Sequence, residues 1–275
     1  MILVIGTDVQ PDPLAQRIVQ HLIARAPARP LAVSRSAPGG TDDLANRGVA
    51  VREFDYGRPA SLHEAFRGIE CIVLAPLPGA LPERLLRQRQ IFRAAAAAGV
   101  ARVIQVSPLH ADTPAGLASA RREREAALAD SGVVHVLLRT VPAIDDLLPL
   151  IEAALADGVL RLSAGDGALS LVSRDELARA IAAAALAPRL GKREHLLTGQ
   201  SALTWEQIAT RIARVGGRPL RYEAEAAADV PAGLFAAMAT GRLAAITTDF
   251  AALVGHPPKS LDCLIHEHFA PRRPA

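Results

Sequence analysis

Short apolar runs alternate with stretches of helical periodicity along the first half of the chain. The first run, residues 1–5, ends at Gly6, and apolar positions then recur at helical spacing from Leu14 to Ile23. Runs that are bounded by Gly and Pro and alternate with such stretches are typical of βαβ units and a parallel sheet. We therefore predict an α/β fold with a doubly wound, Rossmann-like parallel sheet of at least six strands. These strands are expected at residues 1–5, 31–35, 49–54, 71–75, 102–106 and 133–139.

The pattern becomes less regular after residue 140, where helical stretches are separated by short apolar runs. We predict a Rossmann-like dinucleotide-binding core over residues 1–140 and a smaller α/β region over residues 141–275. The smaller region is expected to form a substrate cleft with the carboxyl edge of the core sheet. Two helix starts carry capping signals, Ser61 with Glu64 three residues later, and Thr204.

The first turn from strand to helix, residues 6–13, is where such a sheet usually holds a dinucleotide pyrophosphate against the helix N-terminus. The expected pattern is G-x-G-x-x-G or G-x-x-G-x-x-G, of which only Gly6 is present. Val9 and Asp12 stand where the second pattern has glycine, and two prolines remove backbone donors. We therefore expect binding of NADP(H) to be weak or absent. The alternative is that the loop swings aside and leaves Thr7 and the helix N-terminus facing the phosphates.

Composition narrows the class of protein. Half of the residues are hydrophobic, yet no uninterrupted apolar stretch has the length of a membrane span. The chain starts directly with an apolar strand and leaves no room for a signal peptide, so we expect a cytoplasmic protein. A formal net charge of only +3 and 3% aromatic residues disfavour nucleic-acid binding. Two distant cysteines and the lack of histidines at ligand spacing predict no disulfide and no metal site.

A series of short segments spans nearly the whole chain: residues 1–6, 34–35, 54–55, 59–62 through 68–71, 103–107, 123–139, 164–167, 173–175, 197–199, 202–204, 217–219 and 255–258. In this order and at this spacing they resemble the NmrA-like family of atypical short-chain dehydrogenases/reductases. The resemblance implies that NADP(H) lies across the strand ends. It also implies a small-molecule substrate beneath the C-terminal region.

The resemblance further implies roles for individual residues at the strand ends. Arg35 would pair with the 2′-phosphate of NADP, the alternative being an ordinary surface arginine at a strand end. Asp55 and Tyr56 match positions on the adenine side, and the loop at Ala75 and Pro76 matches the wall beside the nicotinamide ribose. Together with Thr7 of the first loop, the candidate cofactor-binding residues are Gly6, Thr7, Arg35, Asp55, Tyr56, Ala75 and Pro76.

Catalytic candidates are defined partly by what the chain lacks. Short-chain reductases use a Tyr-x-x-x-Lys pair, but neither Tyr56 nor Tyr222 has a lysine four residues later. The polar residues that remain at the strand ends include the candidates Ser107, His110 and Arg121. The resemblance implies the choice of Arg121, with Arg122 as the alternative, because many relatives carry a lysine or histidine at this position. A histidine can exchange a proton near neutral pH, whereas an arginine stays charged and can only hold an anion or polarise a carbonyl. The alternatives are that Ser107 only shapes the turn before a proline and that His110 is a solvated loop residue.

These features favour the hypothesis of an NADPH-dependent oxidoreductase that acts on a small quinone-like or aromatic carbonyl substrate. Hydride transfer to a quinone depends on positioning more than on a strong protein acid, so the missing Tyr/Lys pair is tolerable. Two alternatives stay open because a fold does not determine a function. They are a non-catalytic sensor or regulatory protein and a cofactor-independent enzyme of secondary metabolism. A homodimer is compatible with the sequence.

Overall fold

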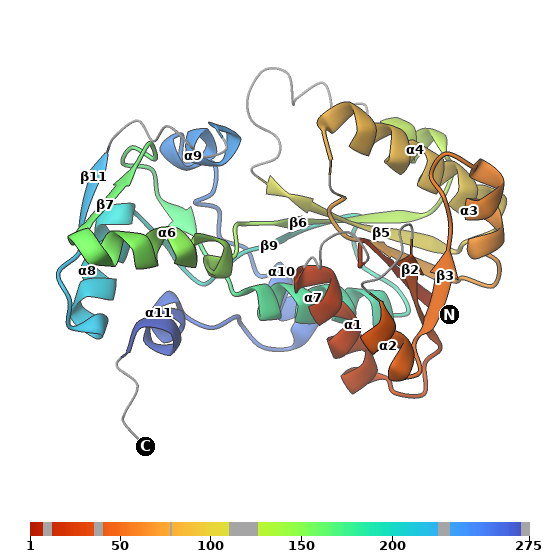
Figure 1. Cartoon of the computed structure of the whole chain (residues 1–275), viewed down its shortest axis with the longest axis horizontal. Coiled ribbons are helices and arrows are strands. Elements are labelled where there is room, and N and C mark those ends of the chain that lie inside the picture. The colour runs from red at the N-terminus through yellow and green to blue at the C-terminus, as the bar shows by residue number, and fades with distance from the viewer. Residues whose placement is uncertain (8–12, 36–40, 78, 110–125, 225–231, 271–275) are drawn as a thin grey trace. The chain divides into compact units, whose positions relative to one another are not determined.

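The computed structural model describes residues 1–7, 13–35, 41–77, 79–109, 126–224 and 232–270. Its internal contacts divide the chain into two units. Figure 1 draws the helices and strands of the chain, coloured from the N-terminus to the C-terminus. The first unit comprises Met1–Ser107, Gly116–Arg139 and Ala178–His195, and the second comprises Pro108–Ala115, Thr140–Leu177 and Leu196–Ala275. Each unit therefore combines segments that are distant in the sequence.

A seven-stranded sheet has the order β3-β2-β1-β4-β5-β6-β9. Its strands are β1 (Ile2–Ile5), β2 (Leu31–Arg35), β3 (Ala50–Glu53), β4 (Cys71–Leu74), β5 (Arg102–Pro108), β6 (His135–Thr140) and β9 (Glu194–Leu197). The pairs from β3 through β5 are parallel. The strand order reverses between β1 and β4, as in a doubly wound dinucleotide-binding fold. The predicted fold class is confirmed. The seventh strand, β9, lies outside the six predicted strands.

The two central strands are buried along their whole length. All four residues of β1 and all four of β4 are buried, as expected for parallel strands covered by helices on both faces. The helices that connect the first five strands are α1 (Pro13–Arg25), α2 (Asp42–Asn46), α3 (Pro59–Ala65) and α4 (Leu81–Ala97). One hydrophobic cluster joins Leu3 and Ile72 of these strands to Phe66 and to Phe92 of α4. These contacts hold the carboxyl ends of the strands at one edge of the sheet.

The start of α3 differs from the prediction. The helix begins at Pro59, with Arg58 as N-cap and no side-chain capping bond, so the predicted capping box at Ser61 is wrong. The fixed φ of proline suits the first helical position, and the N-cap therefore lies three residues upstream of Ser61, at Arg58. Ser61 instead accepts a hydrogen bond from the Asp55 amide at 3.0 Å and donates to the carbonyl oxygen of Arg58 at 2.7 Å. It thereby ties the loop after β3 to the helix.

The second unit has its own core, built around the fully buried Trp205 and residues of α6 (Ile144–Asp157), α8 (Trp205–Gly216) and α11 (Leu261–Phe269). Thr204 caps α8 and completes a capping box with Gln207, which confirms the predicted cap. The other helices of this unit are α9 (Ala232–Ala239) and α10 (Asp249–Val254), and it shares α7 (Arg174–Leu186) with the first unit. Its short strands are β7 (Val159–Leu162), β8 (Leu169–Ser170), β10 (Ala202–Leu203) and β11 (Arg221–Ala224). β7 pairs with β11 in parallel, and β8 pairs with β10 antiparallel.

Two glycines in the second unit permit close backbone contacts. A Cβ on Gly167 would lie 1.8 Å from the carbonyl oxygen of Met238, and one on Gly199 would lie 2.1 Å from the carbonyl oxygen of Leu171. Real Cβ atoms do not approach main-chain oxygens so closely, and the oxygens cannot move without shifting their own segments. These two glycines are therefore needed for packing.

Candidate functional site

The candidate residues of the described chain lie at the carboxyl ends of neighbouring strands in the first unit. Gly6 and Thr7 follow β1, Arg35 ends β2, Asp55 and Tyr56 follow β3, Ala75 and Pro76 follow β4, and Ser107 is near the end of β5. Because the strand order reverses between β1 and β4, the crevice of a doubly wound sheet opens between Gly6 and Ala75. His110 and Arg121 lie outside the described residues.

Gly6 is required by both conformation and space. Its φ of 107° lies in a region that side chains rarely adopt, and an added Cβ would lie 3.2 Å from the Cβ of Ala75. Its amide donates to the Ser34 hydroxyl at 3.3 Å, and the fully buried Thr7 donates its hydroxyl to the carbonyl oxygen of Ser34 at 3.1 Å. The Thr7 side chain is thus engaged inside the unit, so any contact that Thr7 makes with a ligand involves its backbone. Ser34 was not among the predicted site residues, although a serine inside an apolar strand was a visible signal.

Arg35 faces an acidic neighbour. The β2–β3 register places Arg35 opposite Glu53, and the two side chains form an ion pair. About a third of the Arg35 side chain is exposed, against two thirds of the Glu53 side chain. The pair holds the guanidinium at the end of β2, where a ligand phosphate would have to compete with the Glu53 carboxylate for it.

The loop after β3 forms a small ordered group. The Asp55 carboxylate accepts a hydrogen bond from the Gly57 amide at 2.8 Å and another from Arg58 at 3.2 Å. The Arg87 guanidinium of α4 lies 4.9 Å from the ring centroid of Tyr56, and the ring packs edge-on against Phe54. A guanidinium over an aromatic face is a favourable contact. Arg87 therefore helps to hold Tyr56 at this edge, which the sequence alone did not reveal.

Ser107 has an exposed fraction of only 3%, and within the described part of the chain its hydroxyl has no hydrogen-bond partner. Buried hydroxyls usually have a partner, because leaving one unpaired costs free energy. The hydroxyl is available for a hydrogen bond at the carboxyl end of β5. Ala75 is buried and Pro76 half-buried at the end of the adjacent β4.

Neither tyrosine is placed as a catalytic acid. Tyr222 donates its hydroxyl to the carbonyl oxygens of Gly165 at 2.8 Å and Leu162 at 3.3 Å in the second unit. Burial, followed by the nearby Asp166 carboxylate, raises the pKa of Tyr222 above its ordinary value. Arg139, another polar residue at a strand end, is buried and forms an ion pair with Glu194.

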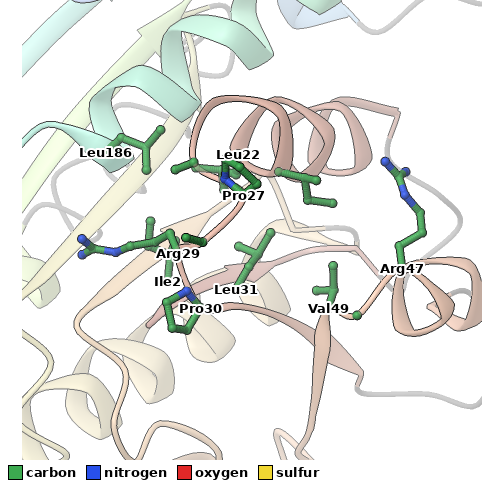
Figure 2. A pocket seen from close by; sticks show the side chains of 13 residues that line it. Ile2, Leu22, Pro27, Arg29, Pro30, Leu31, Arg47, Val49 and Leu186 are labelled. Carbon is green, nitrogen blue, oxygen red and sulfur yellow. The ribbon is translucent and has the colours of Figure 1, made fainter.

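A cavity of about 230 Å³ lies at the opposite, amino ends of β1, β2 and β3 (Figure 2). Ile2, Leu22, Leu31 and Val49 line it, and the labelled arginines stand on its two sides. It is therefore separate from the strand ends that carry Gly6 and Arg35. Among the described residues, no group of three or more His, Cys, Asp and Glu side chains is arranged to hold a metal ion, and no helix is long and apolar enough to cross a membrane.

Comparisons with known proteins give consistent matches. A family model described as NAD(P)H-binding matches residues 13–188. Quinone oxidoreductase 2 of Escherichia coli is 34% identical over 222 residues, which are 80% of this chain and 77% of that protein. An NmrA-like family domain-containing oxidoreductase of Aspergillus flavus is 27% identical over 218 residues, 76% of this chain and 71% of that protein. The crystal structure of an NADPH-dependent quinone oxidoreductase from Escherichia coli, complexed with NADPH, has a TM-score of 0.87 and 30% identity. That match covers 98% of this chain and 100% of the other.

These matches overturn the expectation that NADP(H) binding is weak or absent. The matched family is described as NAD(P)H-binding, and a structure 30% identical over nearly the whole chain is a complex with NADPH. The expectation was wrong because it rested on the turn between Gly6 and Pro13 alone. The family match begins at residue 13, after that turn, and extends over α1 and the following strand ends. The first turn of α1 contains no acidic residue, so its amides and helix dipole remain attractive to a phosphate.

Proposed function

Since the chain belongs to the NmrA-like, NAD(P)H-binding family of atypical short-chain dehydrogenases/reductases, we propose that it reduces a small quinone-like or aromatic carbonyl compound with NADPH. The protein is an NAD(P)H-binding oxidoreductase. The name of its Escherichia coli relative supports a quinone as the acceptor.

One observation carries this proposal: the candidate residues occupy successive strands at one edge of the sheet. Arg35, Gly6, Ala75 and Ser107 end or follow β2, β1, β4 and β5, which are neighbours in that order. Three strand spacings of roughly 4.8 Å separate the first from the last, about 14 Å in all. The row thus offers a cation at one end and a close backbone approach in the middle. At the other end it offers a buried hydroxyl that has no hydrogen-bond partner among the described residues.

Each residue of the row has a role that its chemistry supports. Arg35 binds the 2′-phosphate after releasing Glu53, and Gly6 keeps a Cβ out of the crevice beside the pyrophosphate. Tyr56, held by Arg87, lies with Asp55 on the adenine side. Ala75 and Pro76 form an apolar wall that excludes water beside the nicotinamide ribose.

NADPH, when bound, supplies the hydride. The Ser107 hydroxyl would donate a hydrogen bond to the nicotinamide carboxamide of NADPH or to the oxygen of the acceptor. The buried position of Ser107 keeps such a bond strong. Both tyrosines are engaged elsewhere, so the proton that completes the reduction comes from water or from His110. His110 and Arg121 are kept as candidates on the sequence argument alone.

The test is turnover of NADPH by the purified protein with menadione or a simple benzoquinone as acceptor, followed by the loss of NADPH absorbance. Ser107→Ala should lower kcat/KM by about tenfold, because one hydrogen bond to the reacting complex is lost. Ser107→Thr keeps the hydroxyl and should retain most of the activity. Ser131→Ala is the matched control, since the Ser131 hydroxyl bonds to the carbonyl oxygen of Leu128 in a separate turn.

The alternatives give different results in the same assay. NADPH binding without consumption in the presence of quinone and aromatic carbonyl acceptors would refute the reductase proposal and favour a sensor. Equal activity of Ser107→Ala and the parent protein would remove Ser107 from the site while leaving the reductase proposal intact.

A further inference from the structure

A second cavity lies at the amino ends of β5 and β6, at the opposite edge of the sheet from the row of candidate residues. Its volume is about 430 Å³, within the range of small-ligand sites. Arg102, the first residue of β5, lines this cavity, and Ser107 lies five residues further along the same strand. Five strand residues span about 17 Å, so a small ligand in the cavity does not reach the carboxyl edge.

Positive charge is concentrated in this cavity. Its lining includes four cationic side chains, Arg102, Arg189, Lys192 and Arg193, and one carboxylate, Glu70. The local excess equals that of the whole chain, whose formal net charge is +3. Glu70 already receives a hydrogen bond from Arg29 at 2.7 Å, so its charge is compensated outside the cavity.

The cations differ in how they are held. Arg102 donates to the carbonyl oxygen of Ala185 at 2.7 Å, which restrains its guanidinium. Arg189 and Arg193 are exposed residues of the segment between α7 and β9. Within the described part of the chain neither side chain has an ion-pair or hydrogen-bond partner. Like charges that line one cavity repel each other, and a bound anion would relieve this repulsion.

The cavity also has an apolar side. Val134, Val136 and Leu190 contribute to its lining, and 64% of Val134 is exposed, an unusual fraction for a large apolar residue beside a sheet. A purely inorganic anion would leave this surface in contact with water. An anion that carries an apolar or aromatic group would cover it.

From this combination we propose that the cavity is a binding site for a small phosphate monoester with an apolar or aromatic substituent. Arg189 and Arg193 bind the phosphate oxygens, for which the planar guanidinium is well suited. Val134 and Leu190 contact the substituent. The site is independent of the cofactor edge and of the proposed reduction.

The test is calorimetric titration of the full chain with phenyl phosphate and, in parallel, with inorganic phosphate, at constant physiological ionic strength. We expect phenyl phosphate to bind at least threefold more tightly than inorganic phosphate. The double variant Arg189→Gln/Arg193→Gln should weaken phenyl phosphate binding by about tenfold or more, since two charge-assisted contacts are lost. The matched control is Arg25→Gln/Arg47→Gln, which removes the same charge from two exposed arginines outside this cavity.

Three results would overturn the proposal: no binding of phenyl phosphate at millimolar concentration, equal weakening in both double variants, or no weakening in either. Equal weakening would indicate attraction by diffuse surface charge. Amide chemical shifts of the parent protein give a second measurement that needs no variant. Phenyl phosphate should move the signals of residues 134–136 and 189–193 and leave those of Gly6 and Arg35 in place. Shifts confined to the carboxyl edge would place the anion in the cofactor site and refute a separate one.

Discussion

The ion pair between Arg35 and Glu53 predicts that two neighbouring substitutions change cofactor preference in opposite directions. Arg35 is the candidate partner of the 2′-phosphate, which distinguishes NADPH from NADH. Glu53 lies directly opposite on β3 and holds the guanidinium in the structure. Arg35→Ala should therefore weaken NADPH binding, and Glu53→Gln should strengthen it, while NADH binding changes little in either variant.

The magnitude follows from an exchange of partners. A charge-assisted hydrogen bond to phosphate contributes about 1.5–3 kcal/mol. The exposed pair that must be broken first contributes only about 0.2–1 kcal/mol, because Glu53 is two thirds exposed and screened by water. The difference, about 0.5–2.8 kcal/mol, corresponds to a loss of roughly twofold to a hundredfold in NADPH affinity for Arg35→Ala. Glu53→Gln removes the competitor and one nearby negative charge, so it should tighten NADPH binding roughly two- to fivefold.

Fluorescence titration of both variants with NADPH and NADH measures these changes. Arg29→Gln is the matched control, since Arg29 stands just before the amino end of β2 and also loses an ion pair with a glutamate, Glu70. It should bind both cofactors like the parent protein. Equal losses of NADPH and NADH affinity in Arg35→Ala would exclude Arg35 from the 2′-phosphate site. Unchanged or weaker NADPH binding in Glu53→Gln would show that the carboxylate does not compete with the phosphate.

Three further predictions concern the second unit. Gly167→Ala should cost at least about 2–3 kcal/mol in urea unfolding, because its Cβ would meet a main-chain oxygen at 1.8 Å, whereas Gly191→Ala, with nothing within 4 Å, should be nearly neutral. Thr204→Ala should lower the unfolding free energy by about 1 kcal/mol through loss of the α8 capping box. Thr204→Ser keeps the capping hydroxyl and should keep the parent's unfolding free energy, which would distinguish capping from packing. Tyr222→Phe should cost about 1 kcal/mol near neutral pH, since it removes the hydroxyl that bonds to two carbonyl oxygens. Because the pKa of Tyr222 is raised in the folded state, its contribution is fully present below its ordinary value of 10.0 and is lost as the pH rises through the folded value. The stability gap between parent and Tyr222→Phe should therefore narrow above that pH, and a constant gap would contradict this assignment.

The positions of the central strands could be predicted because burial leaves a direct mark on the sequence. The β1 and β4 strands are buried throughout, and both appear as continuous apolar runs. Side-chain pairs between neighbouring strands leave no such pattern in the sequence. Nothing in the sequence places Glu53 opposite Arg35, since that contact depends on the register between β2 and β3. The sequence could propose Arg35 as a phosphate ligand but could not reveal its competitor.

Local signals were reliable only where they did not compete with each other. At α8, Thr204 and Gln207 agree with the apolar pattern that follows them, and the predicted cap is present. At α3, the Ser61 signal competes with Pro59, which is equally suited to the first turn. The proline determines the start, and the serine hydroxyl serves the loop instead.

The incomplete glycine pattern led to the wrong prediction that NADP(H) binding is weak or absent. A fingerprint concentrates several contacts in a few residues, so its loss suggested a loss of binding. The cofactor contacts in this fold are distributed over a helix N-terminus and the ends of several strands, and a changed turn removes only some of them. Gly6, which does remain, is the position where the conformation and the neighbouring Ala75 leave no room for a side chain.

The positions of the two tyrosines limit which substrates suit the proposed reaction. Reduction of an ordinary ketone produces a strongly basic alkoxide, which needs a proton donor at the reacting oxygen. The Tyr222 hydroxyl donates its hydrogen bonds to main-chain oxygens. The Tyr56 ring packs against Phe54 and the Arg87 guanidinium. Hydride addition to a quinone instead produces an anion that is delocalised over the ring. A single neutral donor such as the Ser107 hydroxyl can stabilise that anion until water or His110 supplies the proton. The chemistry of the strand-end residues that the structure describes therefore favours a quinone over a simple ketone as the acceptor.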